Sequence, residues 1–144
     1  MIIKYFELKK NLKHNINFYL LYGSNSGLIE ETLNNVLKPN FSKNLYYYDE
    51  KEILSNEGEF IENILNKSFF EQDKLIIINR ISDKILNLIE DILNKKIEDL
   101  KIILISENLE KKSRLRNFFE KNDKTIITPF YEDSYQSLLF LTQN

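Results

Sequence analysis

The sequence predicts an α/β fold in which one mainly parallel, five-stranded sheet is covered by helices on both faces. The first observation is a set of five short apolar runs, at residues 18–22, 45–48, 75–78, 102–105 and 126–128. The runs are continuous and do not alternate with polar residues, as is typical of strands buried on both faces. The second observation is that stretches of helical periodicity separate the runs. This β-α alternation, with right-handed crossovers, predicts a three-layer α/β/α sandwich.

Apolar residues at helical spacing define the expected helices. Their faces are formed by Ile29, Leu33, Val36 and Leu37; by Phe60, Ile61, Ile64 and Leu65; by Ile85, Leu88, Ile89, Ile92 and Leu93; and by Leu115, Phe118 and Phe119. Pro39 is expected to end the first long helix, and residues 8–12 to form a short helix before the first strand. Residues 131–141 again have helical periodicity. Without an internal repeat or a linker, we expect residues 1–144 to form a single domain.

Composition narrows the classes of function. The chain has 20 basic and 22 acidic residues, a formal net charge of -2, so no global positive field favours nucleic acid as the main partner. It has no cysteine and one histidine, His14, which excludes a disulfide framework, a thiol nucleophile and a zinc site. Only a carboxylate site for magnesium would remain, and we predict neither metal nor cofactor. No apolar run approaches the roughly 18 residues of a membrane span, which favours a cytoplasmic protein without a membrane partner.

A glycine-containing loop follows the first apolar run, where nucleotide-binding α/β domains carry their phosphate-binding loop. It reads Gly23-Ser24-Asn25-Ser26-Gly27. Its glycines are four residues apart, whereas those of a phosphate-binding loop are five apart. The lysine that would bind the phosphates and the serine or threonine that would bind magnesium are both missing after Gly27. We therefore interpret the loop as a tight strand-to-helix turn with a degenerate phosphate-binding sequence. Ser24 or Ser26 is expected to cap the following helix.

The remaining polar features do not complete a hydrolytic site. A working ATPase of this kind needs an acidic pair after the third strand, and this chain has Asn79-Arg80 there. Asp49 ends the second strand, as a phosphoacceptor aspartate would, but the other acidic residues and the lysine of a receiver domain are missing. We expect Asp49 to cap the helical segment 50–54.

One dense basic run follows the fourth strand. It contains Lys111, Lys112, Arg114 and Arg116. A solvated helix face explains these residues better than a contact with phosphate or with a partner, although that contact stays open.

Two adjacent aromatic residues, Phe69 and Phe70, precede the polar segment 71–74 and the third strand. Neighbouring side chains point in different directions, so one ring can enter the core while the other faces solvent. An exposed phenylalanine buried in a partner's pocket would contribute roughly 1.5–3 kcal/mol. The pattern alone leaves the choice between core and interface open.

Three segments, taken together and in order, resemble the N-terminal domain of the delta subunit of the bacterial DNA polymerase III clamp loader. They are Phe18-Tyr19-Leu20-Leu21-Tyr22-Gly23-Ser24, Ser68-Phe69-Phe70-Glu71-Gln72-Asp73-Lys74-Leu75-Ile76-Ile77-Ile78 and Leu109-Glu110-Lys111-Lys112-Ser113-Arg114-Leu115-Arg116. The resemblance implies an AAA+ type fold whose delta member is not an ATPase; DNA synthesis belongs to the polymerase holoenzyme. It also implies that a hydrophobic pair, here Phe69 and Phe70, inserts into the sliding clamp (beta subunit) and helps to open it.

The family also has a lid and a C-terminal collar domain that joins the other loader subunits, and this sequence contains neither. We therefore expect a clamp-binding module, monomeric in isolation, that contacts DNA only indirectly or weakly. The alternative is a divergent nucleotide-binding enzyme of the P-loop type, in which Ser24, Ser26 and the helix N-terminus would bind phosphate weakly. If the clamp interpretation holds, Phe69 or Phe70 should be substantially exposed.

Overall fold

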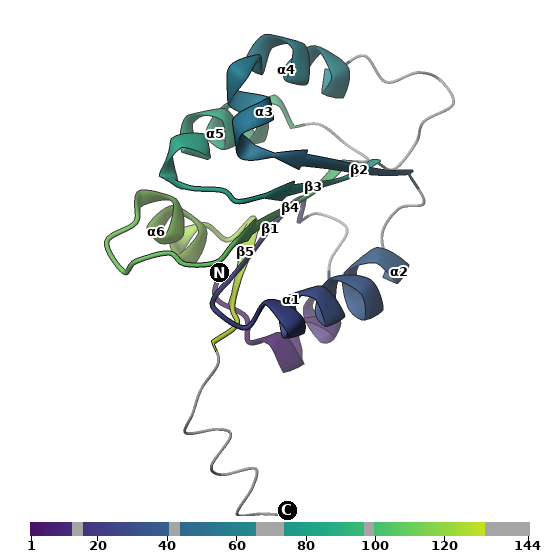
Figure 1. The fold of residues 1–144 in the computed structure, drawn as a ribbon, viewed down its shortest axis with the longest axis vertical. Helices are drawn as coiled ribbons and strands as arrows, with labels where there is room; N and C mark the ends of the chain where they lie inside the picture. The colour runs from purple at the N-terminus through teal and green to yellow at the C-terminus, as the bar shows by residue number, and fades with distance from the viewer. Residues whose placement is uncertain (13–15, 41–43, 66–73, 97–99, 132–144) are drawn as a thin grey trace, which may run out of the picture.

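A computed structural model describes residues 1–12, 16–40, 44–65, 74–96 and 100–131 (Figure 1). Their elements are the 3-10 turns η1 (Tyr5–Glu7) and η2 (Lys9–Asn11), β1 (Phe18–Tyr22), α1 (Ser26–Thr32), the π-helical turn η3 (Leu33–Leu37), α2 (Lys38–Asn40), β2 (Asn44–Asp49), α3 (Glu50–Ser55), α4 (Glu57–Leu65), β3 (Lys74–Asn79), η4 (Asp83–Ile85), α5 (Leu86–Lys95), β4 (Leu100–Ser106), α6 (Arg114–Lys121) and β5 (Thr125–Pro129). Phe69, Phe70, His14 and nearly all of the stretch 131–141 lie outside the described residues.

The five strands form one sheet in the order β2-β3-β4-β1-β5, and every pair of neighbours is parallel. This confirms the predicted five-stranded parallel sheet. Since the strands are parallel, all their carboxyl ends meet at one edge of the sheet and all their amino ends at the other. The first residues of the chain extend the β5 side: Ile3 donates a backbone hydrogen bond to Ile127, and Ile127 donates one to Met1, both at 3.0 Å.

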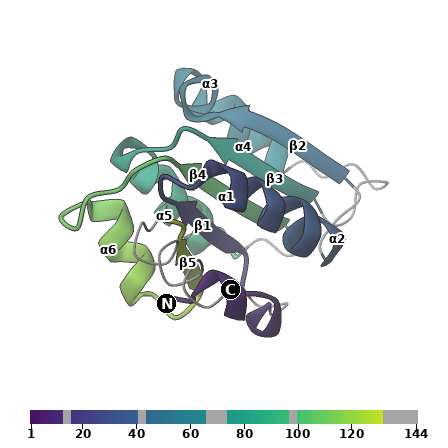
Figure 2. The same cartoon turned by 60° about the horizontal axis from the view of Figure 1, so that its bottom comes forward.

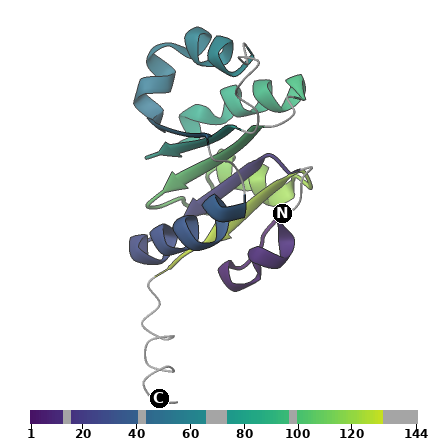
Figure 3. The ribbon, with the colours of Figure 1, turned by 90° about the vertical axis from the view of Figure 1, so that its right-hand side faces the viewer.

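Helices cover both faces of the sheet and bury separate hydrophobic clusters (Figures 1 and 3). Figure 2 shows α1 lying across one face. There Ile29, Leu33 and Leu37 pack against β1, β3, β4 and β5. On the opposite face α3, α4, α5 and α6 contribute the second cluster. Within the described part of the chain, no helix is long and apolar enough to cross a bilayer.

The second strand differs from the prediction of complete burial. Along β2 the exposed fraction alternates: Leu45 is 37% and Tyr47 54% exposed, while Tyr46 and Tyr48 pack against the cluster beneath α4. β2 is an edge strand, and α1 and η3 pack against the other four strands, so its other face is left open. Lys38 lies 5.2 Å from the centre of the Tyr47 ring and covers part of that face.

The helix that follows β1 continues through a π-helical turn into α2, and Pro39 lies in α2, next to Asn40, the last residue of this helix that the structure describes. The backbone N–H of Lys38 donates to the carbonyl of Leu33, five residues back. This wider turn immediately precedes the proline, which has no N–H to continue the hydrogen-bond ladder. Ahead of β1, the expected helix 8–12 is instead a pair of short 3-10 turns.

Candidate functional site

The loop between β1 and α1 is held by hydrogen bonds to the chain's own backbone. The N–H of Gly23 donates to the carbonyl of Ser106 at 3.1 Å, and the N–H of Asn25 donates to the carbonyl of Phe130 at 2.9 Å. The N–H of Phe130 in turn donates to the carbonyl of Tyr22 at 2.6 Å. Phosphate-binding loops present such N–H groups to the ligand. In this chain two of them already have protein acceptors, so the geometry supports the interpretation as a turn.

The cap of α1 differs from the prediction of Ser24 or Ser26. Asn25 is the N-cap, and its side-chain oxygen accepts a hydrogen bond from the N–H of Leu28 at 3.1 Å. Ser26 is already the first helical residue. Asparagine is among the strongest N-cap residues, because its carbonyl reaches the third helical N–H. The prediction overlooked this residue between the two serines.

The ends of β2 and β3 carry an exposed ion pair and no acidic pair. Arg80 lies in the left-handed region at φ 56°, and its Nε is 3.8 Å from Oδ1 of Asp49. The Arg80 side chain is 83% exposed, so this pair contributes little to stability. Among the residues that the structure describes, no three histidine, cysteine or acidic side chains are grouped to hold a metal ion.

Asp49 caps a helix, as predicted. It is the N-cap of α3 and forms a capping box with Glu52, whose carboxylate accepts the N–H of Asp49 at 3.1 Å. This assignment accounts for Asp49 without a phosphoacceptor role.

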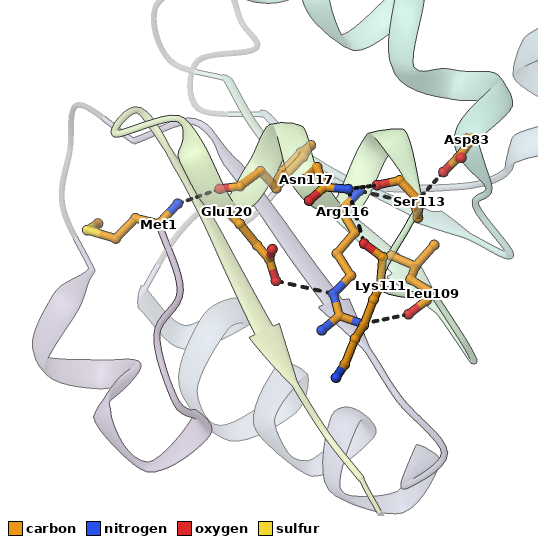
Figure 4. A network of polar contacts seen from close by, with 9 residues as sticks. Met1, Asp83, Leu109, Lys111, Ser113, Arg116, Asn117 and Glu120 are labelled. Carbon is orange, nitrogen blue, oxygen red and sulfur yellow. Dashed lines mark hydrogen bonds and ion pairs between the residues drawn. The ribbon is translucent and has the colours of Figure 1, made fainter.

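A chain of polar contacts along the carboxyl edge connects three helices and was not predicted. Glu50, at the start of α3, is buried and accepts hydrogen bonds from the N–H and the hydroxyl of Ser82, the hydroxyl at 2.7 Å. The next residue, Asp83, accepts a hydrogen bond from the Ser113 hydroxyl (Figure 4). It also accepts one from the backbone N–H of Arg114 at 3.1 Å. The pair Ser82-Asp83 ahead of an apolar helix is a sequence signal for a helix start. The burial of Glu50 depends on the fold and has no such signal.

The pKa of Asp83 lies below its ordinary value. Partial burial acts to raise it, and the hydrogen bonds from Ser113, Arg114 and Leu115 lower it by more. A carboxylate at the start of α6 also interacts favourably with the helix dipole. The contacts between η4 and α6 are therefore most stable when the Asp83 carboxylate is ionised.

The four cations of the basic run are in different environments, and Figure 4 shows two of them, Lys111 and Arg116. Arg116 is half-buried; its Nε donates to Glu120 at 3.2 Å and its Nη1 to the carbonyl of Leu109 at 2.9 Å. Its guanidinium also lies 5.1 Å from the centre of the Tyr22 ring. Lys111, Lys112 and Arg114 are exposed, and Lys112 pairs loosely with Glu110 at 3.7 Å. A contact with phosphate therefore remains a prediction for these three, while the contacts of Arg116 are internal.

The chain segment that contains Phe69 and Phe70 is bounded by well-packed elements. Before it, Phe60 and Ile64 anchor α4 in the core, and Leu65, the last residue of α4, is 50% exposed. After it, β3 begins at Lys74, between β2 and β4. The structure thus fixes both ends of this segment.

Comparison with known proteins supplies the family. A protein-family model, described as DNA polymerase III, delta subunit, matches residues 19–128. The chain belongs to this family. Comparison with curated proteins finds no matching sequence.

Among solved structures, the delta-family chain is similar to the Bacillus subtilis DNA clamp loader delta protein, with a TM-score of 0.67 and 18% sequence identity. The similarity covers 96% of this chain and 44% of the Bacillus protein, so the delta-family chain spans less than half of that relative. At this level of identity the likeness establishes the fold.

Proposed function

We propose that this delta-family chain is the clamp-binding domain of a clamp loader, and that Phe69 and Phe70 bind the sliding clamp. The observation that carries the proposal is the family match over residues 19–128, which includes this pair and both elements that bound it. Insertion of the two rings into an apolar pocket would offset part of the cost of distorting the clamp ring. The domain in this way helps to open the clamp during DNA replication, in the cytoplasm.

The surroundings of the pair suit a protein contact. α4 and β3 are packed into the core on either side of it, so a force applied at the contact would act on the whole sheet. Leu65 adds a half-exposed apolar side chain immediately before the segment. Burying one phenylalanine side chain contributes roughly 1.5–3 kcal/mol, and two such rings suffice to dominate an interface.

We further propose that the domain is an AAA+ fold with a degenerate phosphate-binding loop, and that it acts without ATP hydrolysis. Three features support this. The loop has no lysine after Gly27, its N–H groups at Gly23 and Asn25 are bonded within the chain, and Asn79-Arg80 replace the acidic pair. The same features argue against the divergent nucleotide-binding enzyme.

The other partners are assigned through the family. Contacts with the remaining loader subunits would involve lid and collar regions outside these 144 residues. DNA binding by Lys111, Lys112 and Arg114 would be weak and sensitive to salt, because the net charge is -2. We expect the domain to be monomeric in isolation.

The test is the affinity of the chain for the cognate sliding clamp, measured by surface plasmon resonance. Phe69→Ala/Phe70→Ala should raise Kd by about 100-fold or more, since hot-spot aromatics contribute about 2 kcal/mol or more each. A matched control is Tyr5→Ala/Phe6→Ala, an adjacent aromatic pair on η1 in which Phe6 is largely exposed. Addition of ATP with magnesium should not change the clamp affinity of the unchanged chain, the Phe69/Phe70 variant or the Tyr5/Phe6 control. Equal Kd values for the Phe69/Phe70 variant and the unchanged chain would refute the proposal.

A further inference from the structure

Lys74, the first residue of β3, is a charged side chain that is only 7% exposed. Its Nζ donates a hydrogen bond to the carbonyl oxygen of Asn63 at 3.1 Å and lies 5.8 Å from the centre of the Tyr46 ring. Asn63 belongs to the last turn of α4, and Tyr46 to β2. One ammonium group therefore joins the end of α4 to the beginning of β3 and to the neighbouring strand.

This contact has a clear physical basis. The last four carbonyls of a helix have no partner within the helix, and they form the negative end of its dipole. A cation at this position satisfies one carbonyl and is stabilised by the dipole and by the face of an aromatic ring. Placing a lysine in the sheet costs desolvation, which an apolar residue at the same position would avoid. The cation thus serves to fix the end of α4 at a defined place.

We propose that Lys74 is a positioning residue for clamp binding, an inference that rests on the proposed function of Phe69 and Phe70. The chain leaves α4 at Leu65 and enters β3 at Lys74, so the bond from Lys74 to Asn63 ties together the two ends of the segment that carries the pair. Fixing those ends reduces the conformational entropy lost on binding, which raises affinity without any contact between Lys74 and the clamp.

The chain offers a matched control in Lys101. Its Nζ donates to the carbonyl of Ile16 at 2.5 Å and to Oδ1 of Asn17 at 3.2 Å. Lys101 lies on β4, opposite Leu75 in the register of the sheet, so both lysines are near the amino edge. Both acceptors precede β1, so these contacts of Lys101 anchor the residues before β1.

The experiment compares Lys74→Met, Lys74→Arg and Lys101→Met in the 144-residue chain, with clamp affinity and urea unfolding measured for each. Lys74→Met should raise Kd by about tenfold, whereas Lys74→Arg, which keeps the cation, should stay within about twofold. Lys101→Met should lower stability by an amount similar to Lys74→Met and leave Kd unchanged. Amide hydrogen exchange at the end of α4 should be faster in Lys74→Met alone.

Unchanged affinity in Lys74→Met would overturn the inference, and so would an equal loss of affinity in Lys101→Met, since a general loss of stability would explain both. If Lys74→Met does not fold, Tyr46→Leu tests the same anchor, with an expected rise in Kd of about threefold; an unchanged Kd would refute the inference. The Phe69→Ala/Phe70→Ala variant is measured in parallel. If the double variant binds the clamp with normal affinity, the proposed function is refuted. If the double variant loses binding while Lys74→Met keeps its full affinity, only the positioning role of Lys74 is refuted.

Discussion

Replacing Gly23 by alanine should destabilise the fold more than any other single methyl addition at a glycine of this chain. Gly23 has φ +137°, a backbone conformation that L residues rarely adopt. A Cβ at this position would lie 2.0 Å from the carbonyl oxygen and 2.4 Å from the carbonyl carbon of Phe130. These are backbone atoms, so the clash cannot be relieved by rotating a side chain.

The size of the effect follows from what must break. Holding alanine at this φ costs about 1–3 kcal/mol. Moving Phe130 also removes its two backbone hydrogen bonds, to Tyr22 and from Asn25, and each contributes about 0.5–1.5 kcal/mol. The sum is about 2–6 kcal/mol, against a total stability of about 5–15 kcal/mol for an ordinary domain.

Urea unfolding followed by circular dichroism measures this loss, and Gly58→Ala is the matched control. Gly58 lies in α4 with no atom within 4 Å of an added Cβ. The same methyl group should therefore be neutral there or stabilise by up to about 1 kcal/mol, because alanine favours helix. A Gly23→Ala variant within about 0.5 kcal/mol of the unchanged chain would refute the argument that the Phe130 carbonyl occupies the loop.

Two further substitutions test the contacts at α6. Asp83→Asn should cost about 0.3–1 kcal/mol at neutral pH, because the amide keeps an acceptor oxygen but loses the negative charge that interacts with the α6 dipole. The pKa of Asp83 is lowered in the fold, so its stabilisation is present above the unfolded pKa near 3.9 and is lost as pH falls through the lower folded pKa. In urea unfolding, the difference in stability between the variant and the unchanged chain should therefore shrink as the pH is lowered below about 3.9. Arg116→Met should cost about 1–3 kcal/mol, since it leaves Glu120 and a backbone carbonyl without a partner. Lys112→Met, at an exposed position, should change the free energy of unfolding by no more than about 0.5 kcal/mol. Equal losses of stability in Arg116→Met and Lys112→Met would contradict the conclusion that only Arg116 has internal contacts.

Much of the fold could be predicted because it depends on local pattern. The run 18–22 coincides with β1, and each other run lies within a strand of the sheet. Whether a strand lies at an edge depends on the order of the strands, which no single run contains. The exposed Leu45 and Tyr47 alternate with two half-buried tyrosines, but the alternation cannot be recognised in the sequence because all four residues are apolar or aromatic.

The candidate site divides in the same way. The missing lysine after Gly27 and the neutral Asn79 can be recognised directly in the sequence. The group that fills the loop cannot be recognised in this way. It is the backbone carbonyl of Phe130, a residue far away in the sequence, and any residue at that position would provide the same carbonyl. For Arg116, the spacing to Glu120 is a recognisable helical pair, so its internal role could have been inferred. Phe69 and Phe70 remain a prediction.

The two edges of the sheet have different properties. In open parallel sheets, ligands bind outside the carboxyl ends of the strands. Here that edge is occupied by the chain's own contacts: Gly23 and Asn25 donate to backbone carbonyls, and Glu50 and Asp83 accept from neighbouring helices. The amino edge carries Lys74, where the chain enters β3 four residues after Phe70 of the proposed clamp-binding pair. A surface at this edge can gain or lose a protein partner without disturbing the loop, so the proposed degenerate phosphate-binding loop and the proposed clamp-binding pair are physically compatible in one small domain.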